Sequence, residues 1–303
     1  MASVDVGRRP RVGLLQVAVS LVALAGIVWW ASRQHSPRIP LDVTAIAWLV
    51  VALALYAGAT VLRGERWHRL LTGSQADQGR GESYRLTTIG YMGNNTLPAR
   101  AGDLMRVMML GSPRRIVLGT VVAERVLDAL ALAAIFAVVV AARGLSFGPL
   151  PYVVAAGAIG AAALAVAWRV APSSRRLLAA REWVRPAIWS TRDLLGRRGV
   201  ALLVVSLVVW LVEASVYLTV GSATGVSLGL VGALYVVALT NLSALIPAAP
   251  GYVGTFDAAV LLALGSLRLP SLGYLLVLRF VLFVPITVVG LAVLLARTSR
   301  RRQ

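Results

Sequence analysis

A short phrase that contains proline and glycine occurs twice in this chain, each time inside a long apolar region. The copies read Leu-Pro-Ala-Arg-Ala-Gly over 97–102 and Ile-Pro-Ala-Ala-Pro-Gly over 246–251, which is 149 residues further on. Proline removes a backbone donor and glycine tolerates unusual dihedral angles, so both phrases predict a break in a helix. Broken backbone that faces lipid is costly, so these segments must be buried in protein or line a cavity.

The apolar content predicts an all-α polytopic membrane protein. Hydrophobic residues make up 58% of the 303 residues. A bilayer core of roughly 30 Å needs about 20 apolar residues in a helix. We predict six full spans, at Val12–Ser32, Val43–Leu62, Ile116–Ala142, Gly144–Trp168, Gly199–Gly221 and Gly273–Ala296. Two further segments, Tyr84–Leu110 and Leu228–Leu267, carry the repeated phrases and are predicted to be re-entrant hairpins.

The distribution of arginine predicts the orientation. The formal net charge is +18, and all 30 basic residues are arginine. With both termini in the cytoplasm, 22 arginines fall in cytoplasmic segments, which include the loop Arg63–Arg85, and four fall in external loops. Such a bias is typical of the cytoplasmic face of a membrane protein. It argues against a nucleic-acid partner, because the longest polar stretch, Arg169–Arg198, is too short for a soluble domain.

The predicted path is an inverted repeat within a single transmembrane domain, 1–303. Two spans, a hairpin and one span occur twice, over about 12–142 and about 144–296, and the second copy starts from the opposite face. Transporters built this way hold their substrate where the broken segments meet near the midplane. In the alternative topology each hairpin crosses the membrane fully, which gives eight spans.

Charged residues inside the predicted membrane region are the first candidates for a functional site, because burying a charge there is costly. Glu124 and Asp128 lie four residues apart and share a helix face. Arg125 flanks that face and can pair with Asp128 at three-residue spacing, which leaves one carboxylate in need of a partner. Arg100 and Arg106, in the preceding hairpin, can supply further partners. Two interpretations stay open: a structural ion-pair network, or a site that handles substrate or protons.

The first hairpin adds polar groups beside its break. Asn94 and Asn95 precede Pro98 and can bond freed carbonyls or a headgroup, and Asp103 can cap a half-helix. Arg100 can hold a phosphate group through two N–H donors.

The second hairpin contains one carboxylate, Asp257, in an otherwise uncharged run. We expect it to approach Arg279 in the last span. The break itself adds Pro247, Pro250 and Gly251 as candidate substrate-binding positions. Glu213, in the fifth span, lies either deep in the membrane or near the outer interface.

Metal and cofactor chemistry are not expected. The chain has no cysteine, and neither of its two histidines, His35 and His68, lies in a metal-binding pattern. We therefore assign no cofactor and no metal ligand.

Three short motifs occur in order along the chain: N-x-x-P-x-R-x-G-[ED] over 95–103, E-R-x-x-D over 124–128 and P-x-x-P-G-x-x-G over 247–254. By these motifs the chain resembles the transmembrane domain of the lysylphosphatidylglycerol synthases and its stand-alone, flippase-like relatives. Asp103 and Asp257 stand where glutamate is more usual, and Tyr252 stands where a small residue is common.

This resemblance implies movement of a lipid with a polar or anionic headgroup between the leaflets of the cytoplasmic membrane. It does not imply aminoacyl-lipid synthesis, which belongs to an additional soluble domain, so we expect no enzyme activity. The implied partner is a membrane lipid, and a second copy of the chain or a lipid-modifying enzyme stays open. The alternative function is ion- or proton-coupled transport of a small polar solute. A role as assembly partner of a membrane transferase is a third hypothesis.

Overall fold

The computed structural model describes residues 42–74, 76, 78–97, 100–110, 113–143, 196–244, 250–270 and 272–300, which form helices and turns without a strand. Four helices within these ranges are long and apolar enough to cross a membrane. They are α2 (Val43–Thr72), α5 (Arg114–Arg143), α8 (Arg197–Ala223) and α11 (Leu272–Arg300). The protein is therefore a multi-pass membrane protein. Four of the predicted spans lie in these helices, and those at Val12–Ser32 and Gly144–Trp168 lie outside the described residues.

Two pairs of shorter helices lie between the long ones, and each pair is broken where the sequence predicts. The first hairpin consists of α3 (Arg80–Thr96) and α4 (Ala101–Leu110). The second hairpin consists of α9 (Gly229–Ser243), the 3₁₀ turn η3 (Pro250–Tyr252) and α10 (Thr255–Ser266). With 10 residues in α4 and 12 in α10, these limbs are roughly 15–18 Å long at 1.5 Å per residue, about half a bilayer core.

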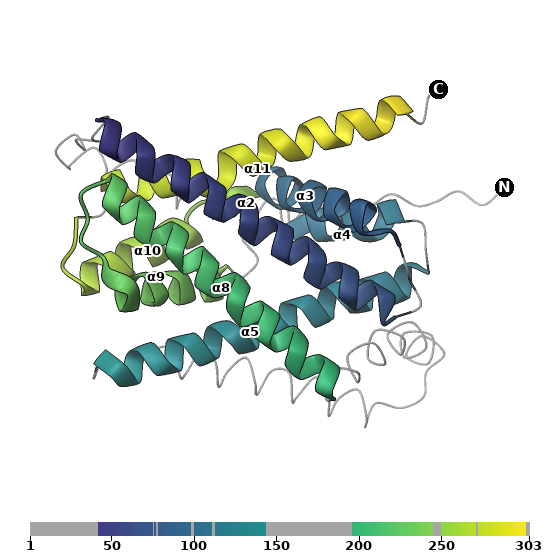
Figure 1. Cartoon of the computed structure of the whole chain (residues 1–303), viewed down its shortest axis with the longest axis horizontal. Helices are drawn as coiled ribbons and strands as arrows, with labels where there is room; N and C mark the ends of the chain where they lie inside the picture. Colours follow the sequence, from purple (N-terminus) through teal and green to yellow (C-terminus); the bar gives the residue numbers. More distant parts are fainter. Residues whose placement is uncertain are drawn as a thin grey trace, which may run out of the picture.

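The two hairpins lie at opposite ends of the long helices (Figure 1). Helices α2 and α8 run antiparallel and pack against each other, and α5 lies below them in this view. The first hairpin lies at the end where α2 stops and α5 begins, with α11 packed along α3. The second hairpin lies at the end where α8 stops and α11 begins.

Helix α2 continues to Thr72, ten residues beyond the predicted end of its span at Leu62. Arg63 and Arg66 were expected in a cytoplasmic loop, and this expectation was wrong, because both are buried on the helix. The buried face of α2 keeps a helical spacing through them: Ala52, Tyr56, Ala59, Arg63, Arg66 and Leu70.

Two apolar clusters form the interior of the described bundle. One surrounds the second hairpin with α8, α11 and the far part of α5, and the other surrounds the first hairpin with the end of α2 and the start of α5. Along α5 the clusters meet between Leu127 and Ala131, where Asp128 lies. The polar groups of the candidate site are therefore at the junction of two apolar cores.

Candidate functional site

A cavity of about 90 Å³ lies between the two hairpins and the long helices α2, α5, α8 and α11. Its lining combines charged, amide and aromatic side chains, which is unusual so deep inside an apolar bundle. The charged and amide residues are Arg63, Arg100, Arg125, Asp128, Glu213, Asn94, Asn95 and Asn241. The aromatic residues are Tyr56, Tyr91, Trp210, Tyr252, Phe256 and Phe283.

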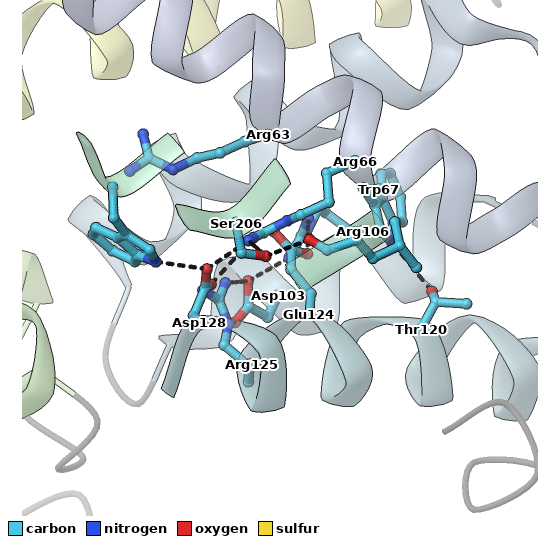
Figure 2. A network of polar contacts seen from close by, with 12 residues as sticks. Arg63, Arg66, Trp67, Asp103, Arg106, Thr120, Glu124, Arg125, Asp128 and Ser206 are labelled. Carbon is cyan, nitrogen blue, oxygen red and sulfur yellow. Dashed lines mark hydrogen bonds and ion pairs between the residues drawn. The ribbon is translucent and has the colours of Figure 1, made fainter. Parts of the chain in front are cut away.

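Arg66 is the centre of an ion-pair network beside this cavity (Figure 2). Its guanidinium donates to both oxygens of Asp128, at 2.6 and 3.2 Å, and to Glu124 at 3.1 Å. A further bond of 2.7 Å reaches the hydroxyl of Ser206 in α8. Trp210, also in α8, donates its indole N–H to Asp128 at 3.2 Å. The network joins α2, α5 and α8, and the side chains of Arg66 and Glu124 are 0% exposed.

The first hairpin enters the same network through two of its residues. Asp103 accepts from Arg125 at 3.1 and 2.8 Å and from Arg106 at 2.9 Å. Arg106 also lies 3.1 Å from Glu124, and its guanidinium lies over the ring of Trp67, 4.8 Å from the centroid. The predicted contacts between Arg106 and the α5 carboxylates, and between Arg125 and Asp128, are thus confirmed.

Asn94 joins the two limbs of the first hairpin. Its side chain accepts from the backbone N–H of Asp103 and donates to the Asp103 carboxylate, both at 3.2 Å. The capping group at the start of α4 is therefore the amide of Asn94, in place of the predicted Asp103 carboxylate. Gly102 permits this contact, because a Cβ there would lie 2.0 Å from the carbonyl oxygen of Gly90. Asn95 instead donates a hydrogen bond of 3.0 Å to the hydroxyl of Thr287 in α11.

Arg63 and Glu213 form a second buried ion pair, between α2 and α8. The Arg63 guanidinium carbon lies 5.5 Å from the ring centroid of Tyr91 and 5.3 Å from that of Trp210. Both rings lie within cation–π distance of the guanidinium, and its Nη2 donates to Glu213. Of the two positions considered for Glu213, the deep one is correct.

The buried charges around the cavity almost cancel within the described residues. The carboxylates are Asp103, Glu124, Asp128 and Glu213, and each lies within 4.0 Å of at least one of the arginines Arg63, Arg66, Arg106 and Arg125. Arg100 remains, and no carboxylate of the described chain lies within 4.0 Å of it. It was expected to contact the α5 carboxylates, yet its Nη1 donates to the backbone oxygen of Ala244 at 3.2 Å.

In the second hairpin the predicted approach of Asp257 to Arg279 is confirmed. Arg279 donates to both oxygens of Asp257, with its Nη2 at 2.7 Å from Oδ2, and to the carbonyl of Gly251 at 3.3 Å. The Asp257 carboxylate also accepts from the backbone N–H of Gly254 at 2.9 Å, which caps α10. This pair lies next to the cavity and does not line it.

The ion pairs of the two hairpins are geometrically equivalent. Asp103 and Arg125 are 22 residues apart, as are Asp257 and Arg279, and both arginines donate through Nε and Nη2. The second pair follows the first by 154 residues, which is also the distance between the starts of α4 and α10 and between those of α2 and α8. The repeated phrases are only 149 residues apart, because the second break, 244–254, is longer than the first, 97–100.

Of the predicted site residues, Asn94, Asn95, Arg100, Arg125 and Asp128 line the cavity. Asp103, Arg106 and Glu124 lie behind it in the ion-pair network. Pro250 and Gly251 form the η3 turn, whereas Pro98 and Pro247 lie outside the described residues.

Sequence reasoning missed many of the lining and network residues, among them Arg63, Arg66, Trp210 and Tyr252. The helical spacing that links Arg63 and Arg66 to Tyr56 was visible in the sequence and would have placed both arginines on the buried face of α2.

Comparison with known families gives one match, and it covers most of the chain. The profile of the lysylphosphatidylglycerol synthase TM region matches residues 14–290. No individual curated protein and no solved structure shows a significant match. The predicted resemblance is thereby confirmed, and the chain belongs to the lysylphosphatidylglycerol synthase TM-region family.

Proposed function

We propose that this protein moves a lipid with an anionic headgroup across the cytoplasmic membrane, and that the headgroup binds at Arg100. The observation that supports the proposal is the environment of Arg100: it lines the cavity between the hairpins, and no carboxylate of the described residues lies within 4.0 Å of it. A headgroup that crosses hydrocarbon unaided loses its hydrogen bonds to water, which costs several kcal/mol or more. A polar cavity replaces those bonds while the acyl chains stay in lipid.

The charge of the site favours a singly charged headgroup. The five arginines and four carboxylates around the cavity leave one net positive charge. A phosphodiester carries one negative charge, so its complex with the site would be neutral. A neutral complex has the smallest cost in a low-dielectric interior. Arg100 and the N–H edge of Arg63 are the donors that we assign to the phosphate, with Asn94 and Asn95 as neutral contacts.

An inverted repeat with re-entrant hairpins is the topology that we propose. Three observations support it: the short limbs of the hairpins, their positions at opposite ends of the long helices, and the 154-residue offset between equivalent ion pairs. Six spans result if Val12–Ser32 and Gly144–Trp168 cross as well.

The orientation that we propose has both termini in the cytoplasm. Arginines gather at the end of the bundle that holds the first hairpin, at Arg69, Arg80, Arg85, Arg114, Arg115, Arg197, Arg198 and Arg297. At the other end, Arg268 follows α10. By the positive-inside rule the arginine-rich end is cytoplasmic.

The size of the cavity favours one alternative. About 90 Å³ is well below the several hundred Å³ of common ligand pockets. The described conformation must therefore open before it admits a headgroup, whereas a small solute needs less opening. Transport of a small polar anion coupled to an ion or proton is the alternative function.

Leaflet exchange in proteoliposomes tests the proposal. Vesicles with fluorescent phosphatidylglycerol, phosphatidylethanolamine or a neutral glycolipid would be compared with and without a membrane potential, for the wild type and Arg100→Gln. Exchange of an anionic lipid that is lost in Arg100→Gln supports the proposal. Arg268→Gln, at the loop after α10, is the matched control and should exchange normally. Equal exchange by the wild type and Arg100→Gln, or exchange by neither, would overturn the proposal.

A further inference from the structure

Arg100 and Tyr252 have the same unusual backbone conformation at the two helix breaks. Their φ angles are +56° and +53°, in the left-handed region that residues other than glycine rarely adopt. Such strained positions persist only when their surroundings hold them, and they often occur at switch regions. In this protein each holds a side chain against the other hairpin.

The side chain of Arg100 forms a direct contact between the hairpins, which we call the inter-hairpin contact. Its Nη1 donates to the carbonyl oxygen of Ala244, at the end of α9, at 3.2 Å. Its guanidinium carbon lies 5.5 Å from the ring centroid of Tyr252, in η3. Its Nε is buried and has no described acceptor.

The partners in the inter-hairpin contact are weak ones for an arginine. A guanidinium has five N–H donors, and here one of them meets a neutral carbonyl. A phosphate oxygen forms shorter charge-assisted bonds, often two in parallel, that are roughly twice as strong as neutral ones. An anion in the cavity would therefore compete with Ala244 for Arg100, because both need the same donor edge.

We propose that a phosphate group bound in the cavity takes the donors of Arg100, breaks the inter-hairpin contact, and so releases the end of α9 and the η3 turn from the first hairpin. This inference rests on the proposed function and adds the coupling step: the substrate itself releases the contact between the hairpins and widens the cavity. Tyr252 is a positioning residue in this scheme, since it holds Arg100 toward the second hairpin until an anion arrives.

The other polar contacts of the first hairpin stay in place during this release. Asn95 is held to α11 through Thr287, and Asp103 is held to α5 through Arg125. Arg297, near the end of α11, pairs with Glu82 of α3. None of these bonds involves Arg100, and η3 also stays bonded to α11 through Arg279 and the carbonyl of Gly251. The movement expected on anion binding is therefore that of the end of α9 relative to the first hairpin.

Pulsed electron paramagnetic resonance between two spin labels can measure this movement. The labels attach to introduced cysteines, and because the chain has no cysteine of its own, no background substitutions are needed. Spin labels at Leu104→Cys in α4 and Leu242→Cys in α9 would report the distance between the hairpins. Leu104 is 54% exposed and Leu242 is half-buried, so both tolerate labels. The pair Leu104→Cys and Val122→Cys, in α4 and α5, is the control, since the contact between Asp103 and Arg125 holds these helices together.

The probes are dihexanoyl-phosphatidylglycerol, inorganic phosphate and uncharged dihexanoylglycerol, each added to the detergent-solubilised protein. We expect the hairpin distance to shift with phosphatidylglycerol and the control distance to stay constant. A shift with inorganic phosphate as well would show that the phosphate group is sufficient. A shift with lipid alone would show that acyl chains are also needed. No shift with either anion, or an equal shift with dihexanoylglycerol, would overturn the inference.

Two variants of Tyr252 and one of Arg100 complete the test. Tyr252→Leu removes the ring, so the hairpin distance should already be partly shifted without ligand. Tyr252→Phe keeps the ring and should behave like the wild type. Arg100→Gln should not respond to phosphatidylglycerol. If Tyr252→Leu matched Tyr252→Phe, Tyr252 would have no positioning role.

The outcomes separate this inference from the proposed function. Arg100-dependent leaflet exchange without a distance shift would leave the function in place and remove the coupling step. A phosphate-dependent shift without exchange of any lipid would keep the coupling step and move the function to transport of a free anion.

Discussion

Arg66 and Asp128 form a bidentate ion pair that joins α2 to α5 inside an apolar bundle, with 0% of the Arg66 side chain and 6% of the Asp128 side chain exposed. The two residues are 62 positions apart, and Arg66 also donates hydrogen bonds to Glu124 and Ser206. Removing one partner of a buried ion pair costs far more stability than replacing both partners with apolar residues. The stability of the bundle therefore depends strongly on this single arginine.

Replacing Arg66 with methionine should destabilise the protein by about 3–5 kcal/mol, because Asp128 and Glu124 would lose their shared partner. The free energy of unfolding, measured by denaturant titration in detergent micelles, checks this. Arg69→Gln is the control: it breaks an exposed pair with Glu65 on the same helix and should cost about 0–1 kcal/mol. The double variant Arg66→Met with Asp128→Leu should recover part of the loss. Equal stability of Arg66→Met and Arg69→Gln would contradict this account.

Substituting Gly102 with alanine should force the limbs of the first hairpin apart. A Cβ at this position would meet the carbonyl oxygen of Gly90 at 2.0 Å and the backbone nitrogen of Asn94 at 2.4 Å. We expect a loss of about 1–3 kcal/mol, typical of overpacking, together with loss of transport because Arg100 and Asp103 are displaced.

Gly81→Ala is the matched control, since no atom lies within 4 Å of a Cβ there. It should leave the thermal midpoint unchanged or raise it slightly, because alanine favours the helix. A Gly102→Ala protein with a midpoint equal to that of Gly81→Ala would show that the close approach of the limbs is not needed.

The pair Asp257 and Arg279 should behave as a coupled unit in a double-mutant cycle. Asp257→Asn leaves the Arg279 charge without its carboxylate, and Arg279→Gln leaves the Asp257 charge alone, so each single variant should be clearly destabilised. The double variant should cost less than the sum, with an interaction energy of about 0.5–3 kcal/mol. Additive losses in unfolding titrations would show that the ion pair contributes nothing beyond its separate residues.

The proposed topology predicts which loops face the cytoplasm. Single cysteines at Arg80, Arg114 and Arg268 would be labelled with a membrane-impermeant thiol reagent in intact and in opened cells. Only the cysteine at position 268 should react in intact cells, because the first hairpin returns to the side from which it enters. In the eight-span alternative, the first hairpin crosses once, so positions 80 and 114 would lie on opposite sides. That pattern of labelling would overturn the re-entrant hairpins.

Periodicity and composition predicted the long helices well, because a bilayer imposes a fixed length on an apolar helix. The breaks at the two hairpins were equally visible, since proline and glycine act locally. The pairing of Asp257 with Arg279 could also be inferred, because each was the nearest opposite charge in an apolar run.

Contacts between distant helices were harder to infer. Arg63 and Arg66 looked like loop residues because arginine is common at the cytoplasmic ends of spans. Their partners, Glu213 and Asp128, lie 150 and 62 residues away, so only the packing of α2 against α8 and α5 reveals them. Arg100 was assigned to the wrong neighbours for a related reason: its direction depends on a left-handed backbone conformation at position 100 that no sequence pattern indicated.

The position of Arg63 and Arg66 on α2 also affects how the protein is made. Helix α2 leaves the ribosome long before α5 and α8, which hold the matching carboxylates. At the centre of a helix each unpaired arginine would cost about 2.5–3.5 kcal/mol on insertion scales. Both lie in the last third of α2, where long side chains can reach the interfacial water. In the newly inserted helix both arginines can therefore stay hydrated. They become buried only when the later helices are synthesised and pack against α2.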